Sequence, residues 1–135
     1  DVQERCSDAV TPLHAAAFGG HVDAVGALCA ARADVGAMAK DGARPLHSAA
    51  ASGNAIIVWA LCAARADVDV AKHTGATPLH VAAWAGHAHA VRCLSAFGAD
   101  STRKFGDTTP YDLARGAGHL EIARELAQHG LREKK

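Results

Sequence analysis

Large aromatic side chains are scarce in this sequence, since Phe, Trp and Tyr together make up only 4% of its 135 residues. Half of the residues are nevertheless apolar, and alanine supplies much of that half. This composition argues against a core built mainly from large side chains, and we expect backbones to pack closely across small ones. Because only 21% of the residues are charged, the composition is also unlike that of a disordered chain.

An excess of either charge is missing as well, because fourteen Lys and Arg residues balance fourteen Asp and Glu residues. This balance argues against nucleic-acid binding as the main function, which needs clustered basic side chains. No long apolar run is present that could span a membrane. Residues 1–8 (DVQERCSD) lack the apolar stretch of a signal peptide. The first residue is Asp1 rather than Met, so we expect the chain to be a piece of a longer protein.

Metal-binding and catalytic motifs are also lacking. The cysteines do not form a Cys-x2-Cys pair, and the nine histidines contain no His-x3-His pair on one face, so no zinc site or other cofactor is predicted. No serine lies in a Gly-x-Ser-x-Gly context and no phosphate-binding loop is present, which favours a protein that is not an enzyme. Unpaired cysteines fit reduced thiols in the cytoplasm or nucleus. We expect three of them to be buried as small hydrophobes, Cys29, Cys62 and Cys93, and Cys6 to be exposed.

What the sequence does contain is an internal repeat. The four prolines, Pro12, Pro45, Pro78 and Pro110, are 33, 33 and 32 residues apart. A Thr-Pro-Leu-His pattern surrounds the first and third, Arg-Pro-Leu-His the second, and Thr-Pro-Tyr-Asp the fourth. A glycine lies eight residues after each proline, followed by His21, Asn54, His87 or His119. Such a period predicts stacked structural units rather than one continuous globule.

Each unit has the features of two short helices and a loop. The proline suits the first position of a helix, and the preceding Thr11, Thr77 and Thr109 are good N-caps, whereas Arg44 is a poor one. The glycine ends this helix, and a second helix with apolar residues at i, i+3, i+4 and i+7 follows. Loops that contain Lys, Asp and Gly then lead into the next unit. The inward positions of the second helices include Val25, Val58, Val91 and Ala123, and Leu28, Leu61, Leu94 and Leu126.

Together these residues resemble an ankyrin-repeat domain of four units, and the resemblance covers roughly residues 6–131. It implies an all-α solenoid of stacked helix-turn-helix units joined by short β-hairpin-like loops. We expect a single domain over residues 1–135, with repeats at approximately 6–38, 39–71, 72–103 and 104–135. The resemblance also implies that the histidines of the repeated motif, His14, His47 and His80, bond to backbone and hydroxyl groups of the adjoining hairpin.

Departures from the family pattern carry their own predictions. The second helix of an ankyrin repeat usually ends on a glycine with positive φ, which Gly98 and Gly130 can provide. Arg32 and Arg65 occupy this place in the first two units, where a non-glycine residue costs roughly 1 kcal/mol. The interval before the fourth unit is one residue short, which predicts a truncated hairpin. The polar fourth unit is interpreted as the C-terminal cap.

The function that this resemblance implies is binding of a protein or peptide partner through the concave face and the hairpin tips. No nucleic acid or membrane is expected as a partner, and a monomer is expected. Phe18, Trp84 and Phe97 are the predicted anchors, because aromatic residues dominate interface energetics. The predicted contacts at the hairpin tips are Lys40, Asp41, His73, Thr74, Lys104 and Phe105.

Several alternatives stay open at this point. The chain could be a targeting or autoinhibitory segment of a larger multidomain protein or enzyme. A metal-binding protein and a nucleic-acid-binding protein, through a basic end that includes Arg103 and Arg132, are the others. The aromatic anchors could instead pack locally against the next unit. Trp59 could stack on Arg92 of the neighbouring unit, or it could mark a second interface.

Overall fold

The computed structural model describes residues 11–31, 35–36, 38–39 and 42–133. In this part of the chain eight helices follow one another without a regular strand. Their bounds are α1 (Pro12–Gly19), α2 (Val22–Ala30), α3 (Pro45–Ser52), α4 (Ala55–Ala63), α5 (Pro78–Ala85), α6 (Ala88–Ala96), α7 (Pro110–Gly116) and α8 (Leu120–Glu133). None of these helices is both long and apolar enough to cross a membrane.

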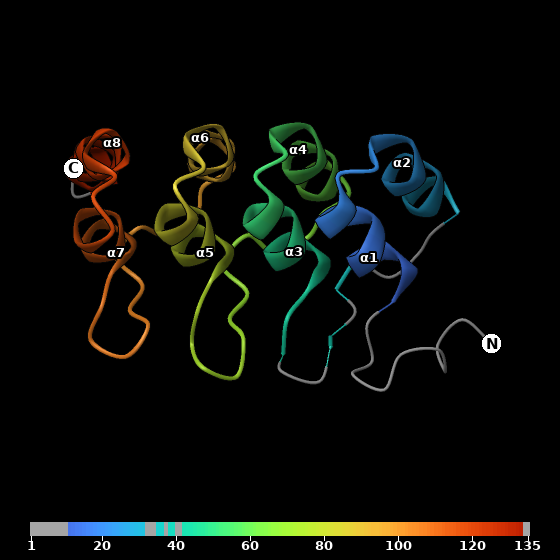
Figure 1. Ribbon diagram of the computed structural model, residues 1–135, viewed down its shortest axis with the longest axis horizontal. Helices are drawn as coiled ribbons and strands as arrows, with labels where there is room; N and C mark the ends of the chain where they lie inside the picture. The colour runs from blue at the N-terminus through green and yellow to red at the C-terminus, as the bar shows by residue number, and fades with distance from the viewer. Residues whose placement is uncertain (1–10, 32–34, 37, 40–41, 134–135) are drawn as a thin grey trace.

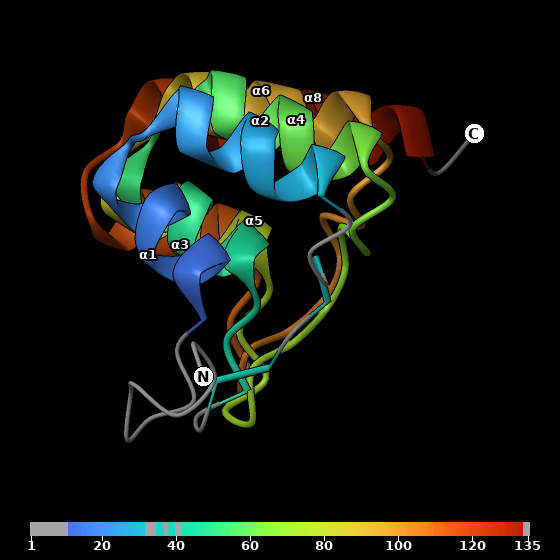
Figure 2. The ribbon, with the colours of Figure 1, turned by 90° about the vertical axis from the view of Figure 1, so that its right-hand side faces the viewer.

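The helices form two stacked layers (Figure 1). The first-helix layer contains α1, α3, α5 and α7, and the second-helix layer contains α2, α4, α6 and α8. Each helix contacts its own partner in the other layer and the equivalent helices of neighbouring pairs. The loops between pairs project from the first-helix layer, away from the second (Figure 2). The predicted all-α solenoid of stacked helix pairs is thus confirmed.

Side chains at the start of the first helices fix where each begins. Pro12 and Pro78 are the first helical residues, and the hydroxyls of Thr11 and Thr77 accept the N–H groups of His14 and His80, both at 3.3 Å. The side chain of Arg44 has no acceptor atom, so α3 begins without this bond. The predicted capping difference between the second unit and its neighbours is therefore present.

The histidines of the repeated motif connect each unit to the next. Nδ1 of His14 accepts the N–H of Thr11, which leaves the proton on Nε2. Nε2–H then donates to a backbone carbonyl in the following hairpin, and the same bond recurs at each junction. The three bonds are His14 to Ala43 at 2.8 Å, His47 to Ala76 at 3.0 Å and His80 to Thr108 at 3.1 Å. The predicted bond to the adjoining backbone is confirmed, whereas the hydroxyl partners of His14 and His80 belong to their own helix caps.

The glycine and histidine that follow the first helix form a second inter-unit contact. Gly53 ends α3 with φ of 80°, and a Cβ on it would overlap the ring of His87 in the next unit. The same ring holds its place through Nε2, which lies 3.1 Å from the carbonyl of Ala51. His119 lies against Gly86 in the same way. The glycine is therefore needed both for its backbone conformation and for the space that the histidine fills.

The hairpins differ in length as the repeat interval predicts. In the second and third units the backbone N–H of the first hairpin residue, Ala39 or Lys72, bonds to the carbonyl four residues later. In the fourth unit Phe105 bonds to Thr108, three residues later, in both directions. Ala39, Lys72 and Phe105 therefore hold the same place in successive hairpins. The one-residue deletion shortens the turn and leaves the following helix in phase.

The core is built from small side chains in the first-helix layer and medium ones between the layers. Paired alanines of α1, α3 and α5 are at most 7% exposed, which allows the close backbone approach that the composition predicts. Leu61, Leu94 and Leu126 are buried as predicted. Leu28 is only partly buried, because α4 is the one second helix among the described residues that packs against α2.

The predicted ends of the second helices have different outcomes. Arg65 has a φ of 73° and Gly98 a φ of 90°, so both adopt the left-handed conformation that the repeat requires. The prediction that Gly130 ends the last helix is wrong, because α8 continues through it to Glu133. The residues after Gly130, Leu-Arg-Glu, are good helix formers and support this continuation. Arg32 lies outside the described residues.

Candidate functional site

The first-helix layer and the last two hairpins form a groove of about 350 Å³. One hairpin contributes Lys72, Thr74 and Ala76, and the next contributes Phe105. The helices α5 and α7 supply the remaining lining residues, which are His80, Val81, Trp84 and Leu113. The indole of Trp84 is 65% exposed although it is one of the largest apolar groups of the chain. A large apolar side chain held in water beside a groove is typical of a binding site.

His80 forms part of the groove wall without bringing a charge to it. Its Nδ1 accepts from Thr77 and its Nε2 lies 3.1 Å from the carbonyl of Thr108, so both ring nitrogens have partners. Burial lowers the pKa of this imidazole, although the bond to Thr108 acts in the opposite direction. The ring of Phe105 contacts His80 edge-to-face, with centroids 6.0 Å apart. His80 is therefore a neutral, fixed support for the aromatic side chain of the last hairpin.

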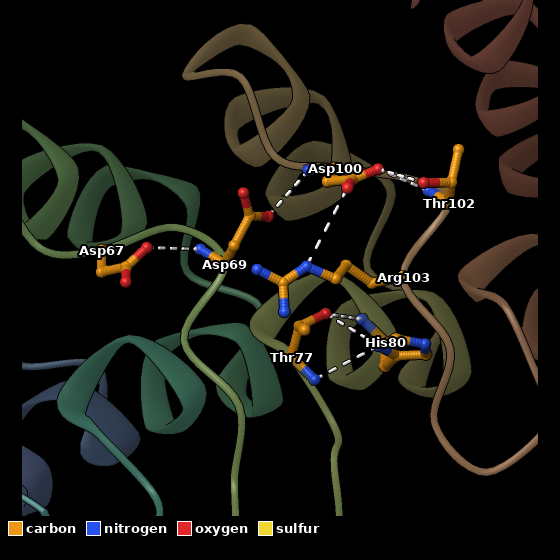
Figure 3. A network of polar contacts seen from close by, with 7 residues as sticks. All are labelled: Asp67, Asp69, Thr77, His80, Asp100, Thr102 and Arg103. Atoms are coloured by element: carbon orange, nitrogen blue, oxygen red, sulfur yellow. Dashed lines mark hydrogen bonds and ion pairs between the residues drawn. The ribbon is translucent and has the colours of Figure 1, made fainter.

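A chain of carboxylate hydrogen bonds lies above the hairpins, in the loops that follow the second helices (Figure 3). The carboxylate of Asp69 accepts the backbone N–H of Asp100 at 2.7 Å, which ties the loops of two units together. Asp100 in turn accepts both the hydroxyl and the N–H of Thr102 and forms an ion pair with Arg103 at 3.9 Å. These bonds, with the Thr102 hydroxyl first, lower the pKa of Asp100. They hold the base of the last hairpin in place beneath α6.

The structure brings three of the predicted partner-binding residues together in the groove: Trp84, Thr74 and Phe105. His73 and Lys104 are exposed on the same hairpins but do not line it. Lys40 and Asp41 lie outside the described residues.

The other five lining residues are not predicted as binding residues from the sequence: Lys72, Ala76, His80, Val81 and Leu113. A signal for two of them was present in the repeat, because the position that holds Ala15 and Ser48 in the first units holds Val81 and Leu113 in the last two. The groove walls therefore become more apolar toward the C-terminal half. Lys72 carries no such signal, since Ala39 and Phe105 are its equivalents.

The other two predicted anchors lie elsewhere. Phe18 on α1 is 64% exposed, but α3 separates α1 from α5 and hence Phe18 from Trp84. Phe97 follows α6 in the second-helix layer and is 37% exposed. Its ring contacts Trp59 of α4 edge-to-face, with centroids 6.5 Å apart. Phe97 therefore packs locally, but against the preceding unit and not against the next one as that alternative states, whereas the indole of Trp84 is mostly exposed.

Trp59 does not stack on Arg92, which is one of the two alternatives that the sequence left open. The Arg92 guanidinium instead faces the next unit, where its Nε lies 2.9 Å from one carboxylate oxygen of Glu125. Its Nη2 reaches Glu125 at 2.6 Å and Glu121 at 3.3 Å. Hydrogen bonds and charge from Glu125 raise the pKa of Arg92, so this side chain is paired and unavailable to the indole.

The cysteines of the described residues are poor nucleophiles. Cys62 is 7% exposed, and burial, reinforced by the thiol of Cys93, raises its pKa to about 12. Burial also raises the pKa of the partly buried Cys29 and Cys93. Their thiolate forms are rare at neutral pH, and the thiolate is the reactive species. Cys6 lies outside the described part of the chain. Among the His, Cys, Asp and Glu side chains that the structure describes, no three gather as a metal site would need.

Comparison with known protein families agrees with the arrangement of the helices. A family model described as ankyrin repeats in three copies matches residues 1–72 and again residues 57–134. The model describes three copies, whereas the described helices form four pairs. None of the curated proteins compared with the sequence matches it. The two matched stretches cover almost the whole chain, so it belongs to the ankyrin-repeat family, whose members serve in general as protein–protein interaction modules and are typically not catalytic.

Proposed function

We propose that this chain is a non-catalytic interaction module that binds a protein partner on the side formed by the first helices and the hairpins. The observation that carries the proposal is the exposed indole of Trp84 above an apolar groove. Burying such a side chain against a partner releases about 25 cal/mol per Å² of apolar surface. Trp84 and Phe105 form the centre of this surface, and Thr74, His73 and Lys104 lie around it.

Rigidity of the groove supports the same proposal. Phe105 is held by His80, and His80 by Thr77 and Thr108, so the aromatic wall is formed before any partner arrives. A partner that binds a preformed wall loses less conformational entropy on binding than one that must order it. Phe18 on α1 belongs to the N-terminal half of the same proposed surface, and Lys40 and Asp41 stay proposed partner contacts from the sequence alone.

The second-helix layer offers the competing surface. Trp59 is 58% exposed on α4, Ile56 is 63% exposed one turn away, and Phe97 lies beside Trp59. These three residues form the outer apolar patch. Because Trp59 already contacts Phe97, part of the apolar surface of its indole is buried within the molecule. The outer apolar patch therefore supplies a matched control for the groove: one exposed tryptophan on each layer.

The test compares Trp84→Ala with Trp59→Ala. A partner captured by the native protein is identified, purified and titrated against both variants, and each variant is checked by thermal unfolding. We expect Trp84→Ala to weaken binding by about 30-fold, which corresponds to about 2 kcal/mol. Trp59→Ala should bind like the native protein, and Trp84→Ala should keep its melting temperature. Loss of binding in Trp59→Ala alone would refute the proposed surface.

A further inference from the structure

The groove contains one formal charge among otherwise apolar and neutral side chains. Lys72 is its only lining residue with a permanent charge, because His80 is neutral and Thr74 is uncharged. None of the ion pairs between the described residues involves Lys72. The nearby Arg103 is paired with Asp100, and Asp107 at the tip of the last hairpin does not line the groove. Lys72 is thus a cation at an apolar wall without an acidic partner in the described structure.

The position of Lys72 relative to the aromatic wall is fixed by the repeat. Lys72 and Phe105 hold the same place in successive hairpins, since each donates its backbone N–H across its own turn. The two hairpins are neighbours, since a Cβ added to Gly75 would lie 3.9 Å from the Cα of Phe105. A ligand group between Phe105 and Trp84 therefore has the Lys72 side chain beside it. This places one apolar subsite next to one cationic subsite.

We propose that the groove binds a peptide segment that inserts one large apolar side chain between Trp84 and Phe105 and pairs an adjacent carboxylate with Lys72. This inference rests on the proposed function and specifies its partner as an acidic, apolar segment. The groove volume is near the lower limit of ligand pockets, ~300–1,000 Å³, so it suits a single large side chain with its neighbouring backbone. A carboxylate near the apolar subsite gives the lysine the partner that it lacks.

A single-stranded nucleic acid fits these residues less well. A base can stack on an exposed indole such as that of Trp84. Strand binding also needs a row of basic side chains that follows the phosphates. The groove supplies one lysine, and the whole chain carries no net charge. A protein segment needs only one charge-assisted contact beside its apolar anchor, so the observed charges favour it.

The probe for this inference is a library of short random linear peptides displayed on phage. The library is selected on the native protein and depleted on Trp84→Ala, and the enriched peptides are synthesised with a fluorescent label. We expect them to share a Trp, Phe, Leu, Ile or Met residue with an Asp or Glu close to it. Binding is then measured by fluorescence anisotropy with Lys72→Gln, Lys72→Glu and the control Arg124→Gln, which removes an exposed positive charge from α8 in the other layer.

The expected result is a graded loss with the charge at position 72. Lys72→Gln should weaken binding about 5-fold and Lys72→Glu by more than about 10-fold, because the latter places two like charges together. Added salt should weaken binding to the native protein more than binding to Lys72→Gln. Arg124→Gln should bind within about 2-fold of the native protein, since an exposed charge on the far layer is screened from the groove.

Several outcomes overturn the inference. Enriched peptides that need Trp84 but lack acidic residues, and that bind Lys72→Glu normally, would refute the partner chemistry and leave the proposed surface intact. Failure to enrich any Trp84-dependent peptide would refute the peptide site itself. Tight binding of a labelled oligothymidylate, or self-association in sedimentation that Trp84→Ala abolishes, would assign the groove to a nucleic acid or a second copy. The proposed function is judged separately, by the comparison of Trp84→Ala with Trp59→Ala on the captured partner.

Discussion

The two helix layers stack through different kinds of contact. In the first-helix layer the same contact recurs at each of three junctions, from the ring of a histidine to a backbone carbonyl of the next hairpin. In the second-helix layer the junctions differ. The α4–α6 junction contains the edge-to-face pair of Trp59 and Phe97, and the α6–α8 junction contains Arg92 with Glu121 and Glu125.

The difference shows which layer sets the register of the stack. A bond to a backbone carbonyl depends on the position of the chain and not on which side chain the next unit carries, so it can be repeated without change. A contact between two side chains needs a suitable residue on both helices and cannot be repeated unless both recur. The first-helix layer therefore fixes the spacing of units, while residues of the second-helix layer are free to vary.

The largest effect should come from breaking the repeated contact in the middle of the stack. His47 is 2% exposed, its Nε2 lies 3.0 Å from the carbonyl of Ala76, and its Nδ1 accepts the N–H of Arg44. His47→Ala leaves both backbone groups without these partners and opens a cavity. We expect a loss of about 3 kcal/mol in the free energy of unfolding, measured in urea.

A histidine of the other layer provides the control for this prediction. His89 on α6 is exposed, and its ring lies 3.4 Å from the guanidinium of Arg92. His89→Ala should change the unfolding free energy by less than about 0.5 kcal/mol. Equal losses in the two variants would show that both layers determine the register.

The features that the sequence predicts correctly are backbone conformations and hydrogen bonds to backbone groups. Helix starts, the histidine bonds, the shortened hairpin and the left-handed Arg65 all follow from the phase of the repeat, because each depends on position within a unit. Contacts between variable side chains did not follow. Phe97 is predicted as an anchor like Trp84, yet its ring contacts Trp59, since the partner of an exposed aromatic depends on which residue the adjacent unit carries.

The candidate site was predictable to the same extent. The sequence predicts Trp84 as an aromatic anchor and Thr74 and Phe105 as contacts at the hairpin tips, and all three line the groove. Lys72 is not predicted, because the role proposed for it depends on which side chains surround it and on the neighbouring hairpin, and neither can be recognised from the lysine alone. The end of α8 was also missed, since a glycine ends a helix only where the chain turns away, and the residues after Gly130 continue the helix.

A smaller loss should follow from filling the space that a histidine of the next unit occupies. In Gly53→Ala the new methyl group would meet the ring of His87, and the left-handed backbone disfavours it as well. We expect a loss of about 2 kcal/mol in the unfolding free energy. Gly98 has φ of 90° but no atom near its Cβ position, so Gly98→Ala should cost only about 1 kcal/mol.

Gly26 completes this series as a control. It lies within α2, has no atom near its Cβ position and does not have a positive φ. Gly26→Ala should therefore stabilise the protein by up to about 1 kcal/mol, because alanine favours the helix. If Gly53→Ala lowered the unfolding free energy no more than Gly98→Ala, the His87 ring would have moved aside without weakening the junction between the units.

Relief of the strained Arg65 should stabilise the protein. Arg65 has φ of 73° and is exposed, and its backbone makes the same hydrogen bonds as the equivalent Gly98. Arg65→Gly should raise the unfolding free energy by about 0.5–1 kcal/mol, the energy of the left-handed conformation less the added freedom of glycine in the unfolded chain. Ala64, with φ of −82°, is the control, and Ala64→Gly should destabilise. Stabilisation by both glycines would point to a general effect of loosening the loop.

The smallest change should come from the ion pair that joins α6 to α8. Arg92 is exposed, and its bonds to Glu125 form in water, where the gain in attraction is offset by hydration and side-chain entropy. Arg92→Ala should lower stability less than His47→Ala, Gly53→Ala and Gly98→Ala, and the loss should shrink as salt is added. The coupling with Glu125 is measured by a double-mutant cycle with Glu125→Ala at low and high salt. A coupling that persists in high salt and rivals the loss in His47→Ala would mean that the second-helix layer holds the last unit in register by its own side chains, which is the reverse of what the repeated histidine bonds indicate.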